Sequence, residues 1–284
     1  MPIEMLAGRQ NPDGGWPYVQ GRSWTEPTVY AVMAMLAVGE KATAQKGLRW
    51  ILAGQRKDGG WAPQPGVDES TWVTALVALL PPEHLGYAHD RAIAWLLETK
   101  GEETSFTYRL REHLLGNQAS LEKQDPGWPW VPGAAAWVGP TAIALLALVK
   151  EVRRKNNPEV QTRIEAGRRF LLSRMCVDGG WNHGSVRALG YESRPYPETT
   201  GMGLVAMRGV KSPKIEQSLS VARGFLNQCH SADALNWLRL GLLAHDQLPA
   251  GFCPPAAVEY RTLIETALQV LVSAVEKGNN LFWS

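Results

Sequence analysis

Acidic and aromatic side chains recur where uncharged, helix-forming stretches of this sequence begin. Four places carry them: Trp24 and Glu26 before 28–36, Asp68, Glu69 and Trp72 around the start of 71–80, Trp137 before 141–149, and Tyr196 and Glu198 before 199–207. Carboxyl groups donate and accept protons, and each aromatic ring face attracts a cation by about 0.5–2 kcal/mol. If the four stretches begin at one end of the fold, these side chains form an acid-lined aromatic cup.

Asp68 is the candidate catalytic acid of that cup, with Glu69 as its catalytic neighbour. Burial and the like charge of Glu69 would set the pKa of Asp68. The candidate substrate-binding residues are Trp24, Glu26, Trp72, Trp137, Tyr196 and Glu198. A structural alternative stays open, because acids suit the first turn of a helix and large aromatic rings suit a packed core.

The histidines and cysteines show no pattern that suits a metal or a redox centre. The six histidines form no HExxH motif, and Cys176, Cys229 and Cys253 are far apart without a CxxC. We expect no metal, no cofactor and no disulfide framework. This cysteine usage is typical of a reducing cytoplasm.

A short tetrad, Asp-Gly-Gly-Trp, organises the elements that must position these side chains. It occurs at Asp13–Trp16, Asp58–Trp61 and Asp178–Trp181, with a shortened copy at Pro126–Trp128. Amphipathic segments lead into the tetrads and nearly uncharged ones follow, which indicates half-exposed and fully buried helices in alternation. We expect the tetrad indoles to be structural and the Gln55 amide to cap backbone groups.

The alternation predicts an all-α fold, a double-walled α/α barrel or α6/α6 toroid of about twelve helices in one domain, 1–284. Outer helices are marked by aromatic residues at 50, 95, 170 and 225. Further helices are expected near 104–116, 232–245 and 256–275. The interval from 95 to 170 is longer than the others, and the topology of 100–136 is left open.

The composition is that of a globular protein without a nucleic-acid partner. The 284 residues are 45% hydrophobic, and 29 Lys and Arg face 27 Asp and Glu without a long run of one sign. The first residues do not resemble a secretory signal, and prolines interrupt the longest uncharged stretch, 126–149. We expect a cytoplasmic protein whose end, Leu281–Trp283, packs on the last helix or, if exposed, contacts a membrane surface peripherally.

One repeat reads Lys46-Gly47-x-x-Trp50-Ile51-x-x-x-Gln55-x-x-x-Gly59-x-Trp61. It matches the QW motif of triterpene cyclases such as squalene–hopene cyclases. From about residue 5 to 230 the chain resembles the terpenoid cyclase/protein prenyltransferase superfamily, with its prenyltransferase and squalene oxidase repeats. The resemblance implies the same toroid and an isoprenoid substrate. It further implies that a class II cyclase carries Asp-x-Asp-Asp where an inner helix starts; here Gly66, Asp68 and Glu69 stand at the first, central and last acidic positions.

Two other activities of this superfamily need residues that the sequence does not offer. The resemblance to prenyltransferase β-subunits would require Asp, Cys and His at inner-helix starts for zinc, and thioester domains would require Gly-Cys-Gly-Glu-Gln. Neither set occurs in the chain.

Three functions therefore remain open. The leading hypothesis is a cyclase-like isomerase that holds an isoprenoid or other apolar substrate in the barrel and protonates an alkene with Asp68. The second is a non-catalytic lipid-binding or interaction module. The third is a carbohydrate-active barrel that uses two of the acids Glu26, Asp68, Glu69 and Glu198 as an acid/base pair. A deep apolar cavity beside Asp68 would favour the first function, and side chains that fill the centre of the barrel would favour the second. Facing carboxylates in a polar cavity would favour the third.

Overall fold

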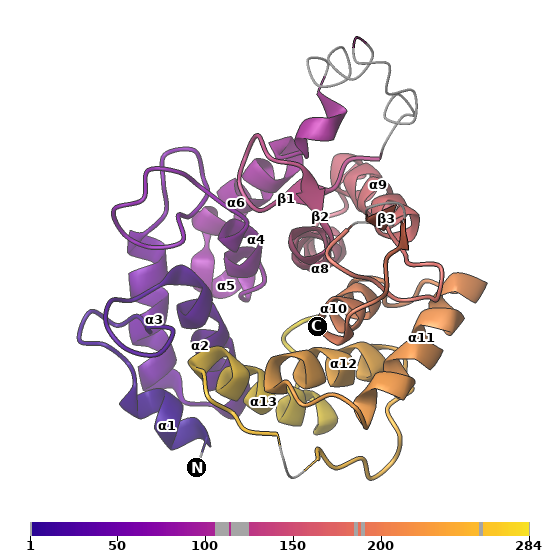
Figure 1. Cartoon of the computed structure of the whole chain (residues 1–284). Coiled ribbons are helices and arrows are strands. Elements are labelled where there is room, and N and C mark those ends of the chain that lie inside the picture. Colours follow the sequence, from indigo (N-terminus) through magenta and orange to yellow (C-terminus); the bar gives the residue numbers. More distant parts are fainter. Residues whose placement is uncertain are drawn as a thin grey trace.

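Six inner helices form a closed ring in the computed structural model. The structure describes residues 2–105, 114, 125–184, 187–188, 191–255 and 258–283. They are α2 (Thr25–Val38), α4 (Val73–Ala78), α8 (Val138–Arg154), α10 (Pro197–Ala206), α12 (Ala232–Ala244) and α13 (Leu263–Glu276). Each helix contacts the next in this order, and α13 contacts α2 (Figure 1). The ring is therefore closed between the two ends of the chain.

A second wall of helices lies outside this ring (Figure 1). It consists of α1 (Pro2–Gly8), α3 (Lys41–Ala53), α6 (Tyr87–Glu98), α9 (Pro158–Ser173) and α11 (Pro213–Leu226). The short α5 (Pro82–Leu85) connects α4 to α6. Between α12 and α13 the described residues form no helix, so a non-helical connection occupies the sixth outer position. The predicted all-α toroid is confirmed.

The two walls differ in burial as their sequences predicted. Every residue of α2 from 27 to 35 is buried, because protein surrounds the helix on all sides. By contrast, α3 buries only Ala44, Gly47, Leu48 and Ile51, which lie on one helical stripe. Outer helices thus pack one face on the ring and leave the other in water.

Four corners between an outer and an inner helix are each held by a buried tryptophan. The indole N–H groups of Trp16, Trp61, Trp128 and Trp181 donate to the carbonyls of Leu6, Ile51, Leu96 and Leu171 at 2.7–2.9 Å. Their backbone N–H groups donate to the hydroxyls of Thr28, Thr74, Thr141 and Thr200. The expectation that these indoles are structural is confirmed, since each joins the end of one helix to the start of the next.

A side-chain amide closes the second corner, the one at Trp61. Gln55 donates to the carbonyls of Gly59 and Ala88 at 2.9 and 2.8 Å, which confirms the expected capping role. At the Trp128 corner, Arg163 from α9 donates instead to the carbonyls of Pro126 and Thr99. Its guanidinium lies 3.4 Å from the centroid of the Trp128 ring, and burial lowers the pKa of Arg163 to about 9.

The remaining described elements are short. They are a 3₁₀ turn (Glu102–Thr104) and two hairpins, in which β1 (Trp128–Pro129) pairs antiparallel with β2 (Ala136–Trp137) and β3 (Arg187–Ala188) with β4 (Tyr191–Glu192). The helix expected at 104–116 lies almost entirely outside the described residues. The last helix was expected from 256 but begins at Leu263, because the Thr262 side chain and Glu265 form a capping box there.

The end of the chain packs into the barrel rather than only on the last helix. Phe282 is fully buried, with its ring centroid 5.8 Å from that of Trp237 on α12. The Lys150 ammonium on α8 donates to the carbonyls of Leu79 and Leu281, and burial lowers its pKa to about 8. In the part of the chain that the structure describes, no helix has the length and apolar character needed to cross a bilayer.

Candidate active site at the mouth of the barrel

Carboxyl groups from three inner helices meet where those helices begin, an end of the ring that we call the mouth. Glu26, Glu198 and Asp233 lie in the first turns of α2, α10 and α12, and all three are half-buried. The charge of Glu198 acts on both Glu26 and Asp233, and that of Glu26 acts on Asp233. These three residues are called the carboxyl cluster below.

Close packing of α10 on α12 brings two members of the cluster together. A Cβ atom at Gly201 would lie only 2.3 Å from the backbone of Trp237, and one at Gly241 would lie 2.8 Å from the carbonyl oxygen of Gly201. Glycine at both positions lets the two backbones touch. Glu198 and Asp233, one turn before these contacts, are positioned by them.

Burial and mutual repulsion favour the protonated forms of two carboxyl groups. Desolvation raises the pKa of Asp233 to about 7, and the charges of Glu198, Glu26 and Glu265 add to the effect. Desolvation also raises the pKa of Glu26, although the Tyr18 hydroxyl, which donates to this carboxylate, opposes the shift. Asp233 therefore retains its proton up to near neutral pH.

Two aromatic rings lie one turn further along the same helices and form the floor of the mouth. Tyr30 follows Glu26 by four residues, and Trp237 follows Asp233 by four, so each ring lies on the same helix face as its acid. Both side chains are 3% exposed, and their rings meet edge to face with centroids 6.4 Å apart. The interior next to the carboxyl cluster is thus filled by side chains.

Further aromatic rings surround the mouth in small groups. Tyr18 packs edge to face on Trp24 at 5.3 Å, and Trp72 on Trp130 at 4.8 Å. His183 lies between Trp137 and Tyr196, with ring centroids at 6.0 and 5.4 Å. Trp137 and Tyr196 are 40% and 49% exposed, so they offer open ring surface to a ligand. The aromatic residues singled out in the sequence all lie at inner-helix starts, and their role in binding stays a prediction.

Asp68 and Glu69 lie away from this environment, on the exposed loop before α4. The Asp68 side chain is 99% exposed, and its carboxylate pairs with Arg56 at 2.7 Å. The hydrogen bonds at the corners explain why Asp68 does not lie where Glu26 does. Thr28 and Thr74 accept the same corner bond in their repeats, so the two residues hold equivalent positions. Glu26 therefore corresponds to Trp72, which comes four positions after Asp68. The burial expected to tune Asp68 is absent, and its catalytic role stays a prediction.

Asp233 was missing from the sequence-based candidates. The helix 232–245 was predicted and matches α12, but no Gly-Gly-Trp corner precedes it, so its first turn was not compared with the others. The signal was present, because Ser231 and Asp233 repeat the cap-x-acid spacing of Tyr196 and Glu198. The Ser231 hydroxyl does cap the helix by accepting from the Ala234 N–H.

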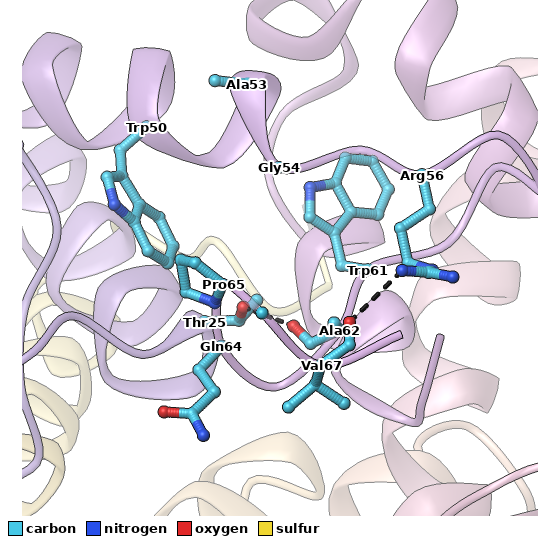
Figure 2. Close-up of a pocket in the computed structure, with 11 residues that line it drawn as sticks. Thr25, Trp50, Ala53, Gly54, Arg56, Trp61, Ala62, Gln64, Pro65 and Val67 are labelled. Atoms are coloured by element: carbon cyan, nitrogen blue, oxygen red, sulfur yellow. Dashed lines mark hydrogen bonds between the residues drawn. The ribbon is translucent and has the colours of Figure 1, made fainter. Parts of the chain in front are cut away.

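A separate pocket of about 320 Å³ opens between the first two corners (Figure 2). Figure 2 shows the indoles of Trp50 and Trp61 on either side of Pro65. Arg56 donates from its wall to the Val67 carbonyl at 3.2 Å, while pairing with Asp68. Asp68 therefore borders this pocket. Arg56 is the charged residue among those that line it, so the pocket lacks the paired carboxyl groups of the mouth.

The described residues include no group of three or more His, Cys, Asp or Glu side chains placed to hold a metal ion. The three acids of the carboxyl cluster therefore interact through their charges, but their side chains are not placed to bind a metal ion. Such an arrangement can move protons between a protonated and an ionised carboxyl group.

Solved structures with this fold include enzymes that act on glycans. A GH8 endo-β-1,4-glucanase from an Achatina fulica gut metagenomic library has a TM-score of 0.61 at 16% identity and covers 96% of this chain and 97% of its own. Endoglucanase Cel10 from Klebsiella pneumoniae, a family 8 glycosyl hydrolase, has a TM-score of 0.62 at 14% identity over 97% and 98% of the two chains. Identities this low show the α/α toroid and no more.

Terpene-handling proteins share the fold as well. The type II terpene cyclase MstE from Scytonema has a TM-score of 0.55 at 16% identity and covers 97% of this chain and 76% of its own. Lanosterol synthase ERG7 from Saccharomyces cerevisiae is 27% identical over 139 residues, 42% of this chain; the match spans only 19% of that enzyme. No protein-family model matches the chain. The structural likeness to the cyclase shows the α/α toroid, and the glucanases are at least as similar in structure.

Proposed function

We propose that the mouth of the barrel is the active site of a glycoside hydrolase in which Asp233 is the general acid and Glu198 is the facing carboxylate. Cleavage of a glycosidic bond needs one carboxyl group that is protonated and one that is ionised. The observation that carries the proposal is the carboxyl cluster, in which burial and like charges raise the pKa of Asp233 to about 7. The charge of Glu26, whose carboxylate accepts from Tyr18, adds to that of Glu198 in raising the pKa of Asp233.

The aromatic rings around the mouth suit this substrate class. Flat rings that are partly exposed, such as Trp137 and Tyr196, provide apolar surface for the C–H faces of sugar rings, while the carboxyl cluster accepts hydrogen bonds from their hydroxyl groups. A site that combines apolar surface with a few polar groups fits an oligosaccharide that lies across the opening.

Proton transfer to an alkene needs a different kind of acid. An alkene is a very weak base, so its protonation calls for a carboxyl group with an unusually low pKa, whereas Asp233 has a raised one. Asp68 is exposed and paired with Arg56. These two observations favour hydrolysis over class II cyclisation at the mouth.

An isoprenoid-binding function is the second candidate, and two observations favour it. The Gln55–Trp61 corner has the bonds of a repeated structural unit that resembles the QW motif, and part of the chain is similar to lanosterol synthase. With this function the aromatic rings would hold an apolar chain. Asp68 would be the catalytic acid if the protein is a cyclase, and it would have no catalytic role if the protein is a non-catalytic module.

One assay with two substrate classes separates these functions. The protein is incubated with soluble β-1,4-glucans, with release of reducing ends as the readout, and in parallel with linear prenyl substrates followed by product analysis. We expect reducing ends from the wild type, a loss of about 10²- to 10⁴-fold in kcat for Asp233→Asn, and wild-type activity for Asp68→Asn. Wild-type glucan activity in Asp233→Asn would contradict the proposal, and a cyclised prenyl product that disappears in Asp68→Asn would establish the second candidate.

A further inference from the structure

We infer that the hydroxyl group of Tyr30 is a substrate-binding donor on the floor of the mouth, where it donates a hydrogen bond to an oxygen atom of the sugar that reaches the carboxyl cluster. This inference rests on the proposed function and deepens it, because it adds a binding residue that no acid pattern in the sequence indicates. Three features of Tyr30 lead to it: its burial, its unused hydroxyl group and its position beneath the acids.

The Tyr30 side chain is buried without a hydrogen-bond partner. It is 3% exposed, and its hydroxyl forms no hydrogen bond with another described residue. The phenol oxygen is nevertheless not among the fully buried polar atoms that lack a partner, so it keeps a small contact with solvent and is open to a ligand. Phenol groups in a packed interior usually have a partner for the hydroxyl group. An apolar residue of similar size would pack equally well against Trp237, so packing alone does not account for a tyrosine here.

The position of Tyr30 on α2 places its side chain near the carboxyl cluster. Tyr30 lies one turn after Glu26 on α2, and the charges of Glu26, Asp233 and Glu198 all act on it. The edge-to-face contact with Trp237, one turn after Asp233, fixes the ring from the opposite helix. Acids from three different inner helices thus lie close enough to act on the phenol group.

The hydroxyl group is a donor at every pH at which the protein would work. Burial, followed by the charge of Glu26 and the other acids, raises the pKa of Tyr30 well above its ordinary value. Tyr18, the other phenol near the acids, already donates to Glu26 and has no donor left. The cluster itself supplies acceptors, so Tyr30 is the neutral donor that complements them at a sugar oxygen.

The test replaces Tyr30 by phenylalanine, with Tyr87→Phe as the matched control because the Tyr87 side chain is 78% exposed. We expect Tyr30→Phe to lower kcat/KM for a soluble β-1,4-glucan by about 10- to 100-fold, the usual effect of losing one hydrogen bond to a substrate. The thermal midpoint Tm should stay equal or rise, because no bond within the protein is lost. A kcat/KM within twofold of the wild type would overturn the inference.

The stability measurement keeps this inference separate from the proposed function. If the wild type hydrolyses the glucan and Tyr30→Phe does so equally well, only the role of Tyr30 fails. If the wild type hydrolyses no glucan, the proposed function fails, and Tm decides the state of the hydroxyl. An equal or higher Tm in Tyr30→Phe would support an unused donor, whereas a Tm lower by several degrees would show a structural bond and overturn the inference.

Discussion

Asp233 differs from an exposed aspartate because it is half-buried and the charges of three other acids act on it. The pKa of its carboxyl group rises from 3.8 to about 7, through desolvation first and then through Glu198, Glu26 and Glu265. Below about pH 4 the folded and the unfolded chain are both protonated at this group. Between pH 4 and 7 only the folded chain retains the proton. The contribution of Asp233 to the free energy of unfolding therefore falls as the pH rises.

We predict that Asp233→Asn stabilises the protein in alkaline solution and not in acid. Above pH 7 the wild type holds an ionised carboxylate in an unfavourable site, and the variant does not. Unfolding by urea should give a free energy of unfolding higher by on the order of 1–3 kcal/mol in the variant at pH 8, with little difference at pH 4. Asp68→Asn, at a side chain that is 99% exposed, is the matched control. Equal curves for Asp233→Asn and wild type at pH 8 would speak against the cluster.

Sequence reasoning located part of this site because helix starts can be recognised. Glu26 and Glu198 were candidates since each precedes an uncharged stretch behind a Gly-Gly-Trp corner. Asp233 lacked that marker, and its raised pKa depends on Glu26 and Glu198, which are distant in sequence. The position of Asp68 could not be foreseen either, because the bonds of Thr74 and Ser70 at the corner, rather than local pattern, determine where α4 begins.

At the scale of the element, the Trp16 corner depends on a small residue in the next outer helix. Gly47 on α3 faces the indole of Trp16 and the side chain of Val32 on α2. A Cβ atom at this position would lie 2.7 Å from the indole and 2.4 Å from the Val32 methyl group. The glycine of the repeat therefore allows the outer helix to approach the inner one.

Two glycine substitutions should consequently have opposite effects. Gly47→Ala should lower the free energy of unfolding by about 1–3 kcal/mol, because the added methyl group overpacks the corner. Gly224→Ala on α11 meets nothing within 4 Å and should raise it by about 0.5–1 kcal/mol, since alanine favours a helix interior. Urea unfolding of both variants measures the difference. Equal effects would mean that the corner does not constrain helix spacing.

At the scale of the whole molecule, the barrel is closed by segments from both ends of the chain. Helix α13 contacts α1 and α2, and the following residues place Phe282 against Trp237 beneath the floor of the mouth. The closure and the two walls could be predicted from the repeats, because helix periodicity and buried tryptophans are local signals. The packing of Phe282 on α12 could not, because it joins segments without a shared pattern.

Phe282→Ala should therefore destabilise the whole barrel. The ring is fully buried, and removing it leaves a cavity under Trp237. We expect a loss of about 3 kcal/mol in the free energy of unfolding. Val177→Ala, at a side chain that is 58% exposed, should change it by less than about 0.5 kcal/mol. A loss for Phe282→Ala as small as that of the control would show that the end of the chain does not support the ring.

Titration of the side-chain carboxyl carbons by ¹³C NMR tests most directly whether the mouth is an acid–base site. The carboxyl cluster predicts one aspartate resonance with a midpoint near pH 7 in the wild type, and the loss of that resonance in Asp233→Asn. In Glu198→Gln the midpoint of Asp233 should move down, because a neighbouring negative charge is removed. If every aspartate of the wild type titrated below pH 5, the three helices would hold no shared proton and the account of the mouth would be wrong.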